Sequence, residues 1–330
     1  MAGIQEIAEK AGVSPATVSR ALRGLQHVNE RTRAKIVEAA ELLGYPIDSV
    51  SKQSGKTNTV GIISPYTSRW FFAEAIAGVA QALRDADMDI LLYNFSQIKG
   101  RDKLAVAKNL RENVDALITI SLPPTEEEFK TMLSLDMPIS LIGFHRPEFS
   151  SVAIDDVLGA RIATQHLVSL GHKKIGILSG DIQTSFEFPV HNNRRAGFIS
   201  VLEESGLELN PQHEVFANFT IETAISAMED LLSRKDLPTA IFCESDEMAY
   251  GAMMAMKKRG LRCPEDISII GFDGHTMAEF ADLTTVAQPV RTLGEMAAWA
   301  VMEKINKPDG LPKTLTLPTT LIVRGSTRAI

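Results

Sequence analysis

The first chemistry in the sequence lies between Ser14 and Asn29, where small polar side chains surround an arginine. The planar guanidinium of Arg20 matches the O6 and N7 acceptors of guanine in the DNA major groove. Pro15 and Ala16 have no hydrogen-bonding side chains, so they would contact apolar surface such as a thymine methyl group. Four neighbours suit contacts to phosphates: Thr17, Ser19, His27 and Asn29. These residue types predict a DNA-reading surface.

Short helices must position these side chains. The apolar positions of the first expected helix recur at helical spacing and are Ile4, Ile7, Ala8 and Ala11. Gly12 then ends that helix, and Ser14 is a suitable N-cap for a second helix with Pro15 in its first position. The second helix would bury Val18, Ala21 and Leu22. Two helices joined by such a tight turn form a helix-turn-helix, which presents the start of its second helix to the major groove.

A third helix is expected after Asn29, which is an N-cap candidate as well as a phosphate candidate. Its apolar stripe would be Ile36, Val37, Ala40 and Leu43, and Gly44 would end it. Periodicity alone leaves an alternative open, in which three small helices pack on each other without binding DNA.

Composition and charge set the wider limits. The 330 residues are 45% hydrophobic and 23% charged, which is typical of two or three globular domains. The net charge is −7, but residues 1–60 hold eight Lys/Arg against six Asp/Glu, so the remainder carries −7 − 2 = −9. Cys243 and Cys263 form no C-x-x-C pair, and no apolar run is long enough for a membrane span. We therefore expect a soluble cytoplasmic protein with no metal and no cofactor.

The stretch I-A-E-K-A-G-V-S-P-A-T-V-S-R-A-L (7–22), followed by H-V (27–28) and L-L-G-Y (42–45), resembles the DNA-binding head of the LacI/GalR family of bacterial regulators. The resemblance implies a helix-turn-helix domain over 1–45 and a hinge over 46–58. In that family a hinge leucine wedges into the minor groove, but Ser54 stands at the leucine position here and the linker is shorter. Val50 is the apolar residue left for that contact.

Beyond Thr59 short apolar runs alternate with helical stretches such as 71–85. The runs are 60–64, 90–94, 116–120, 139–142, 175–179, 240–243 and 267–271. Continuous apolar strands separated by helices predict parallel sheets buried on both faces. Because the pattern that starts at 60–64 is echoed from 175–179, we expect an α/β fold with two doubly wound parallel-sheet lobes. Ligands of such folds bind outside the carboxyl ends of the strands, here between the lobes.

This effector domain, 59–330, also resembles that of the LacI/GalR family, which is itself similar to periplasmic sugar-binding proteins. The resemblance implies one lobe of about 59–155 with 288–318 and another of about 156–287 with 319–330. It places eight residues where the family contacts its effector: Ser64, Tyr66, Phe72, Arg194, Phe219, Ser245, Asp273 and Gln288. Aromatic faces would stack on a sugar, while the arginine and aspartate would hold its hydroxyls. We expect Asp246 to cap the helix that follows it.

Other classes of function fit less well. Neither a Gly-x-x-x-x-Gly-Lys-Ser/Thr nor a Gly-x-Gly-x-x-Gly motif is present, and the seven histidines are scattered, so we expect no enzyme. A sugar-binding transport protein would need a signal peptide and no DNA-binding head. The sequence therefore predicts a DNA-binding repressor, a homodimer on a palindromic operator. Two modes of control stay open, namely a sugar ligand, or a corepressor or phosphorylated partner protein.

Overall fold

The computed structural model describes residues 4–22, 28–43, 57–94, 113–180 and 189–330. The chain divides into two compact units, Met1–Thr59 and Val60–Ile330. The predicted positions His27, Val50 and Ser54 lie outside the described residues. No helix in the part that is described is long and apolar enough to cross a membrane.

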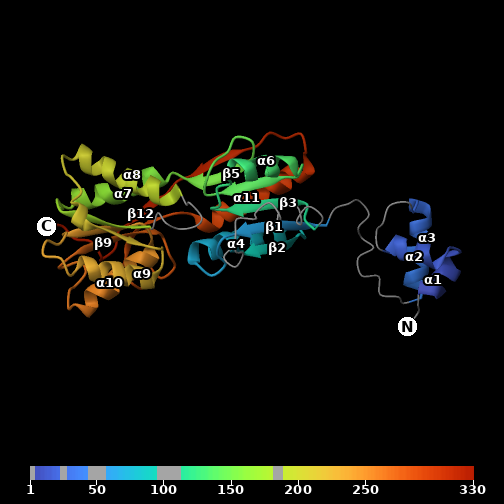
Figure 1. The fold of residues 1–330 in the computed structure, drawn as a ribbon, viewed down its shortest axis with the longest axis horizontal. Helices are drawn as coiled ribbons and strands as arrows, with labels where there is room; N and C mark the ends of the chain where they lie inside the picture. The colour runs from blue at the N-terminus through green and yellow to red at the C-terminus, as the bar shows by residue number, and fades with distance from the viewer. Residues whose placement is uncertain (1–3, 23–27, 44–56, 95–112, 181–188) are drawn as a thin grey trace. The chain divides into compact units, whose positions relative to one another are not determined.

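The described part of the first unit contains three helices, α1 (Ile4–Ala11), α2 (Pro15–Leu22) and α3 (Glu30–Leu42), drawn in blue in Figure 1. Their small core consists of Ile7, Ala8, Val18, Ala21, Ile36, Ala39 and Ala40. Gly12 turns the chain between α1 and α2 with φ +66°, which a residue with a Cβ rarely adopts. Ser14 Oγ accepts a hydrogen bond from Thr17 N at 3.1 Å, and Asn29 Oδ1 accepts one from Thr32 N at 2.8 Å. The predicted helix-turn-helix and both N-caps are confirmed.

The second unit is built on two six-stranded sheets, which Figure 1 shows as separate lobes. The first sheet, in the order β11-β5-β4-β3-β1-β2, contains β1 (Thr59–Ser64), β2 (Asp89–Asn94), β3 (Ala116–Ile120), β4 (Ile139–Ile142), β5 (Ser150–Ile154) and β11 (Thr314–Leu317). The second, in the order β12-β10-β9-β8-β6-β7, contains β6 (Ile175–Gly180), β7 (Glu214–Ala217), β8 (Ala240–Cys243), β9 (Ser268–Asp273), β10 (Thr284–Ala287) and β12 (Thr320–Ile322). Strand β12 runs antiparallel to β10.

Helices cover both faces of each central strand. In the first lobe α4 (Trp70–Arg84) and α11 (Val290–Asn306) pack together on the sheet, and α6 (Glu126–Ser134) follows β3. In the second lobe one face packs on α7 (Asp156–Ser169) and α8 (Pro189–Glu204), and the other on α9 (Ile221–Leu231) and α10 (Asp246–Lys258). A short 3₁₀ turn, η2 (Pro211–His213), precedes β7. This α/β architecture of two doubly wound lobes confirms the predicted fold class.

The chain passes between the two sheets three times, after β5, after β10 and between β11 and β12. Strands β1 and β6 occupy the same position in their sheets, in agreement with the predicted repeat. All seven predicted apolar runs fall on strands, but β5, β7, β10, β11 and β12 were not predicted. These five strands are short, and several are rich in serine, threonine or exposed residues, so no continuous apolar run marks them.

Two glycines allow α4 and α11 to touch backbone to backbone. A Cβ on Gly78 would lie 2.0 Å from the carbonyl oxygen of Arg291, and one on Gly294 would lie 2.1 Å from that of Ala75. The buried stripe of α4 is centred on this glycine contact, because Ala75 and Gly78 are buried whereas Ile76 is half-exposed.

We expect Gly294→Ala to lower the free energy of unfolding of the second unit by about 1–3 kcal/mol, as overpacking usually does. The added methyl group would force α4 and α11 apart, because it meets backbone rather than a flexible side chain. Urea unfolding measures the effect. Gly310→Ala, at an exposed site where the nearest atom would be 3.1 Å away, is the matched control. Equal stabilities of the two variants would contradict the close helix contact.

Candidate functional site

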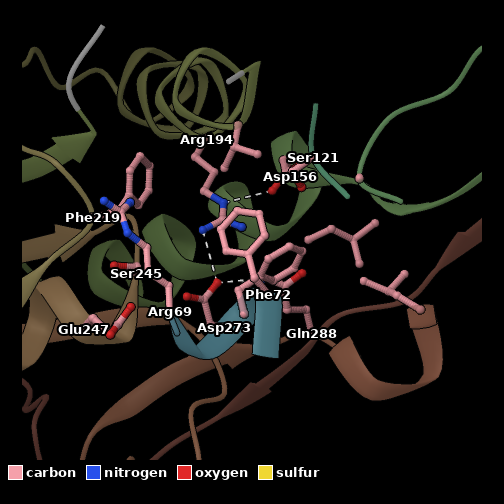
Figure 2. A pocket seen from close by; sticks show the side chains of 15 residues that line it. Arg69, Phe72, Ser121, Asp156, Arg194, Phe219, Ser245, Glu247, Asp273 and Gln288 are labelled. Atoms are coloured by element: carbon pink, nitrogen blue, oxygen red, sulfur yellow. Dashed lines mark hydrogen bonds and ion pairs between the residues drawn. The ribbon is translucent and has the colours of Figure 1, made fainter. Parts of the chain in front are cut away.

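A pocket lies between the two lobes at the carboxyl ends of their strands (Figure 2). The empty space within it, including space open to solvent, is about 740 Å³. The apolar lining is Phe71, Phe72, Ile154, Val190, Phe219 and Leu293. The remaining lining is Arg69, Ser121, Gly143, Asp156, Arg194, Ser245, Glu247, Asp273 and Gln288. Such a position is where doubly wound folds bind ligands.

Six of the eight residues predicted to contact a ligand line this pocket: Phe72, Arg194, Phe219, Ser245, Asp273 and Gln288. Ser64 and Tyr66 do not line it. The Ser64 hydroxyl is fully buried and donates to the Tyr66 carbonyl at 2.6 Å. The Tyr66 ring packs edge-on against Phe72 and carries the Arg69 guanidinium 3.7 Å from its centroid. Ser64 and Tyr66 therefore support the pocket wall in this structure, and ligand contact by the other six stays a prediction.

Arg194 is the centre of the polar wall, and Figure 2 shows its guanidinium between two carboxylates. The residue is 4% exposed. Its Nε donates to Asp156 Oδ1 at 2.9 Å, and its Nη1 donates to Asp273 Oδ1 at 3.3 Å and to the carbonyl oxygen of Glu244. The guanidinium carbon lies 3.7 Å from the centroid of the Phe272 ring, a cation–π contact. These contacts fix the arginine fork before any ligand arrives.

Asp273 is held in place by both its side chain and its strand. It ends β9, and Gln288 Nε2 donates to its Oδ1 at 2.7 Å. Its φ of +118° lies in a region that favours glycine, so the backbone is strained at this aspartate. Burial raises the pKa of Asp273 to about 6, although the charge of Arg194 opposes the rise. Strain and a perturbed pKa at one pocket residue are typical of functional sites.

The role predicted for Asp246 is wrong. Ser245 is the N-cap of α10, and its Oγ accepts from Met248 N at 3.2 Å. Asp246 is completely buried and accepts from Thr285 Oγ1 at 2.6 Å and from His275 N at 2.7 Å. Burial, followed by the nearby charge of Asp273, raises the pKa of Asp246 to about 8. Asp246 thus ties the start of α10 to the loop that follows β9.

Phe219 lies over a gap left by a glycine. A Cβ on Gly180 would stand 2.1 Å from Phe219 Cε2, so only glycine leaves room for the ring in this position. Phe219 follows β7, in the second lobe, whereas Phe72 belongs to α4 in the first lobe. The pocket therefore has an aromatic face from each lobe.

Nine lining residues were not among the predicted contacts, and five of them lie outside the apolar lining: Arg69, Ser121, Gly143, Asp156 and Glu247. Ser121 directly follows β3, a predicted strand, so its position at a strand end could have marked it. Asp156 lies two residues after the end of β5, which was not recognised as a strand. Gly143 follows β4 and has φ +93°. Arg69 and Glu247 come from opposite lobes, and no sequence signal joins them.

In the first unit, the residues predicted to read bases are available on the surface of α2. Pro15, Ala16 and Arg20 are exposed, while Thr17 and Ser19 are half-buried. The Thr17 hydroxyl lies 2.8 Å from Ser14 Oγ. The described part of this unit therefore presents an arginine and two apolar side chains on one helix.

Comparison with known proteins assigns both parts of the chain. Residues 3–46 match the model of bacterial regulatory proteins of the lacI family, and residues 164–327 match the periplasmic binding protein-like domain. The ribose operon repressor of Haemophilus influenzae is 31% identical over 99% of this chain and 98% of its own length. The chain belongs to the LacI family. Its predicted family, and its class as a DNA-binding transcriptional regulator, are confirmed.

Further members of the LacI family are similar over the full length. Catabolite control protein A of Priestia megaterium is 33% identical over 98% of this chain and 99% of its own length. The structure of the transcriptional regulator CelR in complex with cellobiose has a TM-score of 0.72 and 27% identity, and covers 99% of this chain and 100% of that one. These relatives are regulators rather than enzymes, and a transport protein would not account for the match at residues 3–46.

The pKa of Asp273 gives this LacI-family site a pH dependence. Below about pH 6 the carboxylate takes up a proton and accepts fewer hydroxyl hydrogen bonds. For a ligand whose hydroxyls donate to Asp273, we expect the affinity to fall about tenfold from pH 7 to pH 5, because only about a tenth of the carboxylate stays ionised at pH 5. The pKa of Asp273 is higher in the folded protein than in the unfolded chain, so protonation of this group stabilises the folded state as pH falls from 6 to 4. Unfolding driven by this group would therefore not explain the loss of affinity. Calorimetric titration at both pH values measures it, and an Asp273→Asn variant that kept the same pH dependence would contradict the assignment.

Proposed function

We propose that this protein represses carbohydrate-utilisation genes and that a small sugar-like ligand, bound between its lobes, changes its affinity for a palindromic operator. The pocket carries this proposal, because it combines an aromatic face from each lobe with a buried cluster of Asp273, Arg194 and Gln288. Aromatic rings can cover the C–H faces of a sugar, while a fixed carboxylate, guanidinium and amide orient its hydroxyls. The ribose operon repressor is named for a sugar operon, and CelR was solved with cellobiose.

Ligand binding would act through the arrangement of the lobes. Trp70, at the start of α4 in the first lobe, packs against His275 of the second lobe with ring centroids 4.9 Å apart. Phe72 lies two residues after Trp70, Asp273 lies two residues before His275, and both line the pocket. A ligand that touches both lobes favours the arrangement it binds better, and it shifts operator binding by the difference of its two affinities. A titration of operator binding with the ligand present shows whether the ligand weakens or strengthens the binding of the repressor to its operator.

The first unit would read the operator. In this proposal the DNA-binding residues are Ser14, Pro15, Ala16, Thr17, Ser19, Arg20, His27 and Asn29, with Val50 of the hinge at the minor groove. One helix-turn-helix reads one half-site, so a homodimer matches the palindrome. We also propose that residues 1–45 form the DNA-binding domain, 46–58 the hinge and 59–330 the effector domain. The protein would act in the cytoplasm, without enzymatic activity.

Arg20→Ala should cost about 1–3 kcal/mol of discrimination at one base pair of each half-site. The arginine fork is exposed on α2 and is the group suited to guanine. Electrophoretic mobility shifts on operators with single-base changes measure the preference. Lys35→Ala removes an exposed positive charge from α3 and should weaken binding to all sequences equally. Unchanged base preference in Arg20→Ala would show that another residue reads that position.

The proposal is tested with the intact protein. A thermal-shift screen of monosaccharides and disaccharides finds ligands that stabilise it, and each hit is then added to an operator-binding titration. We expect at least one sugar to raise the melting temperature and also to change operator affinity. If no sugar did both, control by a corepressor or a phosphorylated partner protein would replace this proposal.

A further inference from the structure

We propose that the pocket accepts uncharged sugars and rejects phosphorylated ones, and that Asp156 is the residue that sets this selectivity. The inference rests on the proposed function and specifies the ligand class of the same site. It follows from how the charges that line the pocket are paired.

The buried cation of the pocket is already neutralised. Arg194 has two carboxylates around it, Asp156 at 2.9 Å and Asp273 at 3.3 Å, and it also donates to the carbonyl of Glu244. Of the three guanidinium nitrogens of Arg194, Nη2 is the one without a hydrogen bond to a described residue. A neutral hydroxyl can accept from that nitrogen. A phosphate would instead need a surplus of positive charge, and two carboxylates against one guanidinium leave none.

The charges of the described lining point the same way. Among the described residues, two arginines, Arg69 and Arg194, line the pocket against three carboxylates, Asp156, Glu247 and Asp273. An anionic ligand would therefore enter a largely buried site with an excess of negative charge. Like charges brought together at an interface are strongly disfavoured, and burial strengthens the repulsion.

Helix N-termini are the other common phosphate sites, and two of those near the pocket are filled by the protein itself. The Asp155 side chain accepts from Leu158 N at 2.9 Å at the start of α7, and Ser245 caps α10. The starts of α4 and α11 are different, because their N-cap residues, Arg69 and Pro289, make no side-chain cap hydrogen bond. Of these two, the start of α4 also carries a positive side chain, Arg69. Glu247 opposes the charge of Arg69 from the other lobe. A phosphate that did bind would be expected at α4, which gives the test a second arm.

Asp156 is the carboxylate that can be changed without removing a predicted sugar contact. It occupies the first position of α7, just after the chain crosses from β5 to the second lobe, and is 8% exposed. Its role is to cancel the charge of Arg194, whereas Asp273 is predicted to hold the sugar. Asp156→Asn keeps the shape of the side chain and leaves Arg194 with one carboxylate. We infer that this single change makes the pocket more tolerant of a phosphate.

Calorimetric titration of the full-length protein with matched pairs tests the proposal. The probes are D-ribose with D-ribose 5-phosphate, D-glucose with D-glucose 6-phosphate, and D-galactose with D-galactose 6-phosphate. For a pair that binds to the unchanged protein, the Kd of the phosphorylated sugar should be at least about 100 times that of the neutral sugar. In Asp156→Asn this ratio of the two Kd values should be about tenfold smaller. Glu204→Gln, which removes an exposed carboxylate paired with Arg161 outside the pocket, should leave the ratio unchanged.

Each result has a defined meaning. If the unchanged protein bound a phosphorylated sugar more tightly than its neutral partner, this proposal would be overturned, but the protein would still be a sugar-responsive regulator. The affinity of Arg69→Gln for that phosphorylated sugar would then show whether the start of α4 holds the phosphate. An unchanged ratio in a folded Asp156→Asn protein, checked by thermal unfolding, would overturn the role of Asp156. Inorganic phosphate alone should not raise the melting temperature of the unchanged protein. If no pair bound in either form, the proposed sugar response and this selectivity would both fail.

Discussion

Arg194→Met is expected to lower the free energy of unfolding of the Val60–Ile330 unit by about 3–5 kcal/mol, the usual cost of removing one partner from a buried ion pair. Asp156 and Asp273 are 8% exposed each, and both carboxylates rely on this guanidinium. Methionine fills much of the same space, so the loss would come mainly from uncompensated charge. Burial already raises the pKa of both carboxyl groups, and Arg194 opposes that rise.

Urea unfolding monitored by circular dichroism measures this loss, and the neighbouring arginine is a matched control. Arg195 binds Glu214 at 2.6 Å, but its side chain is 39% exposed, so Arg195→Met should cost only about 0–1 kcal/mol. Adding Asp156→Asn to Arg194→Met should recover part of the stability, because one unpaired carboxylate is removed. Equal losses for the two arginine variants would mean that Arg194 is not the electrostatic centre of the site.

Asp273→Gly should uncouple stability from ligand binding. Glycine adopts the φ of +118° without strain, whereas alanine keeps the strain and also loses the carboxylate. We therefore expect Asp273→Gly to be roughly 1–3 kcal/mol more stable than Asp273→Ala. Both variants should bind the sugar at least about 100-fold more weakly, because each loses hydrogen bonds to a charged acceptor.

Comparing the two variants separates the effect of backbone strain at Asp273 from the effect of losing its carboxylate. Both remove the same contacts to Arg194 and Gln288, so their difference in melting temperature reports the backbone conformation alone. Calorimetric titration gives the affinity. If alanine were as stable as glycine at this position, the strain assigned to Asp273 would be absent. If affinity were retained in both, the sugar would bind elsewhere.

Local patterns were enough to predict the head and the central strands. Ser14 and Asn29 cap helices as their residue types suggested, and Gly12 makes the turn. Six of the seven apolar runs became interior strands, because a central parallel strand is buried on both faces and must be apolar throughout. The seventh run became β2, an edge strand whose side chains are partly exposed. Edge strands such as β11 and β12 are partly exposed and carry threonines, so their sequences do not differ from those of loops.

The pocket was predicted only where a family resemblance supplied positions. Arg194, Asp273 and Gln288 were anticipated in this way, but their mutual hydrogen bonds depend on three separate segments meeting. Asp156 was missed because β5 was not recognised, so its carboxyl end was never searched. Asp246 was taken for a helix cap, although its partners Thr285 and His275 are distant in the chain and invisible to local reasoning.

The most direct test of the account is the operator affinity of the intact protein, measured by fluorescence anisotropy with and without a saturating sugar that raises its melting temperature. We predict a change of about 5–150-fold, the usual range of allosteric coupling, which is lost in Asp273→Ala. An unchanged operator affinity with the sugar bound would contradict the account, because a ligand between the lobes would then have no influence on the DNA-binding head.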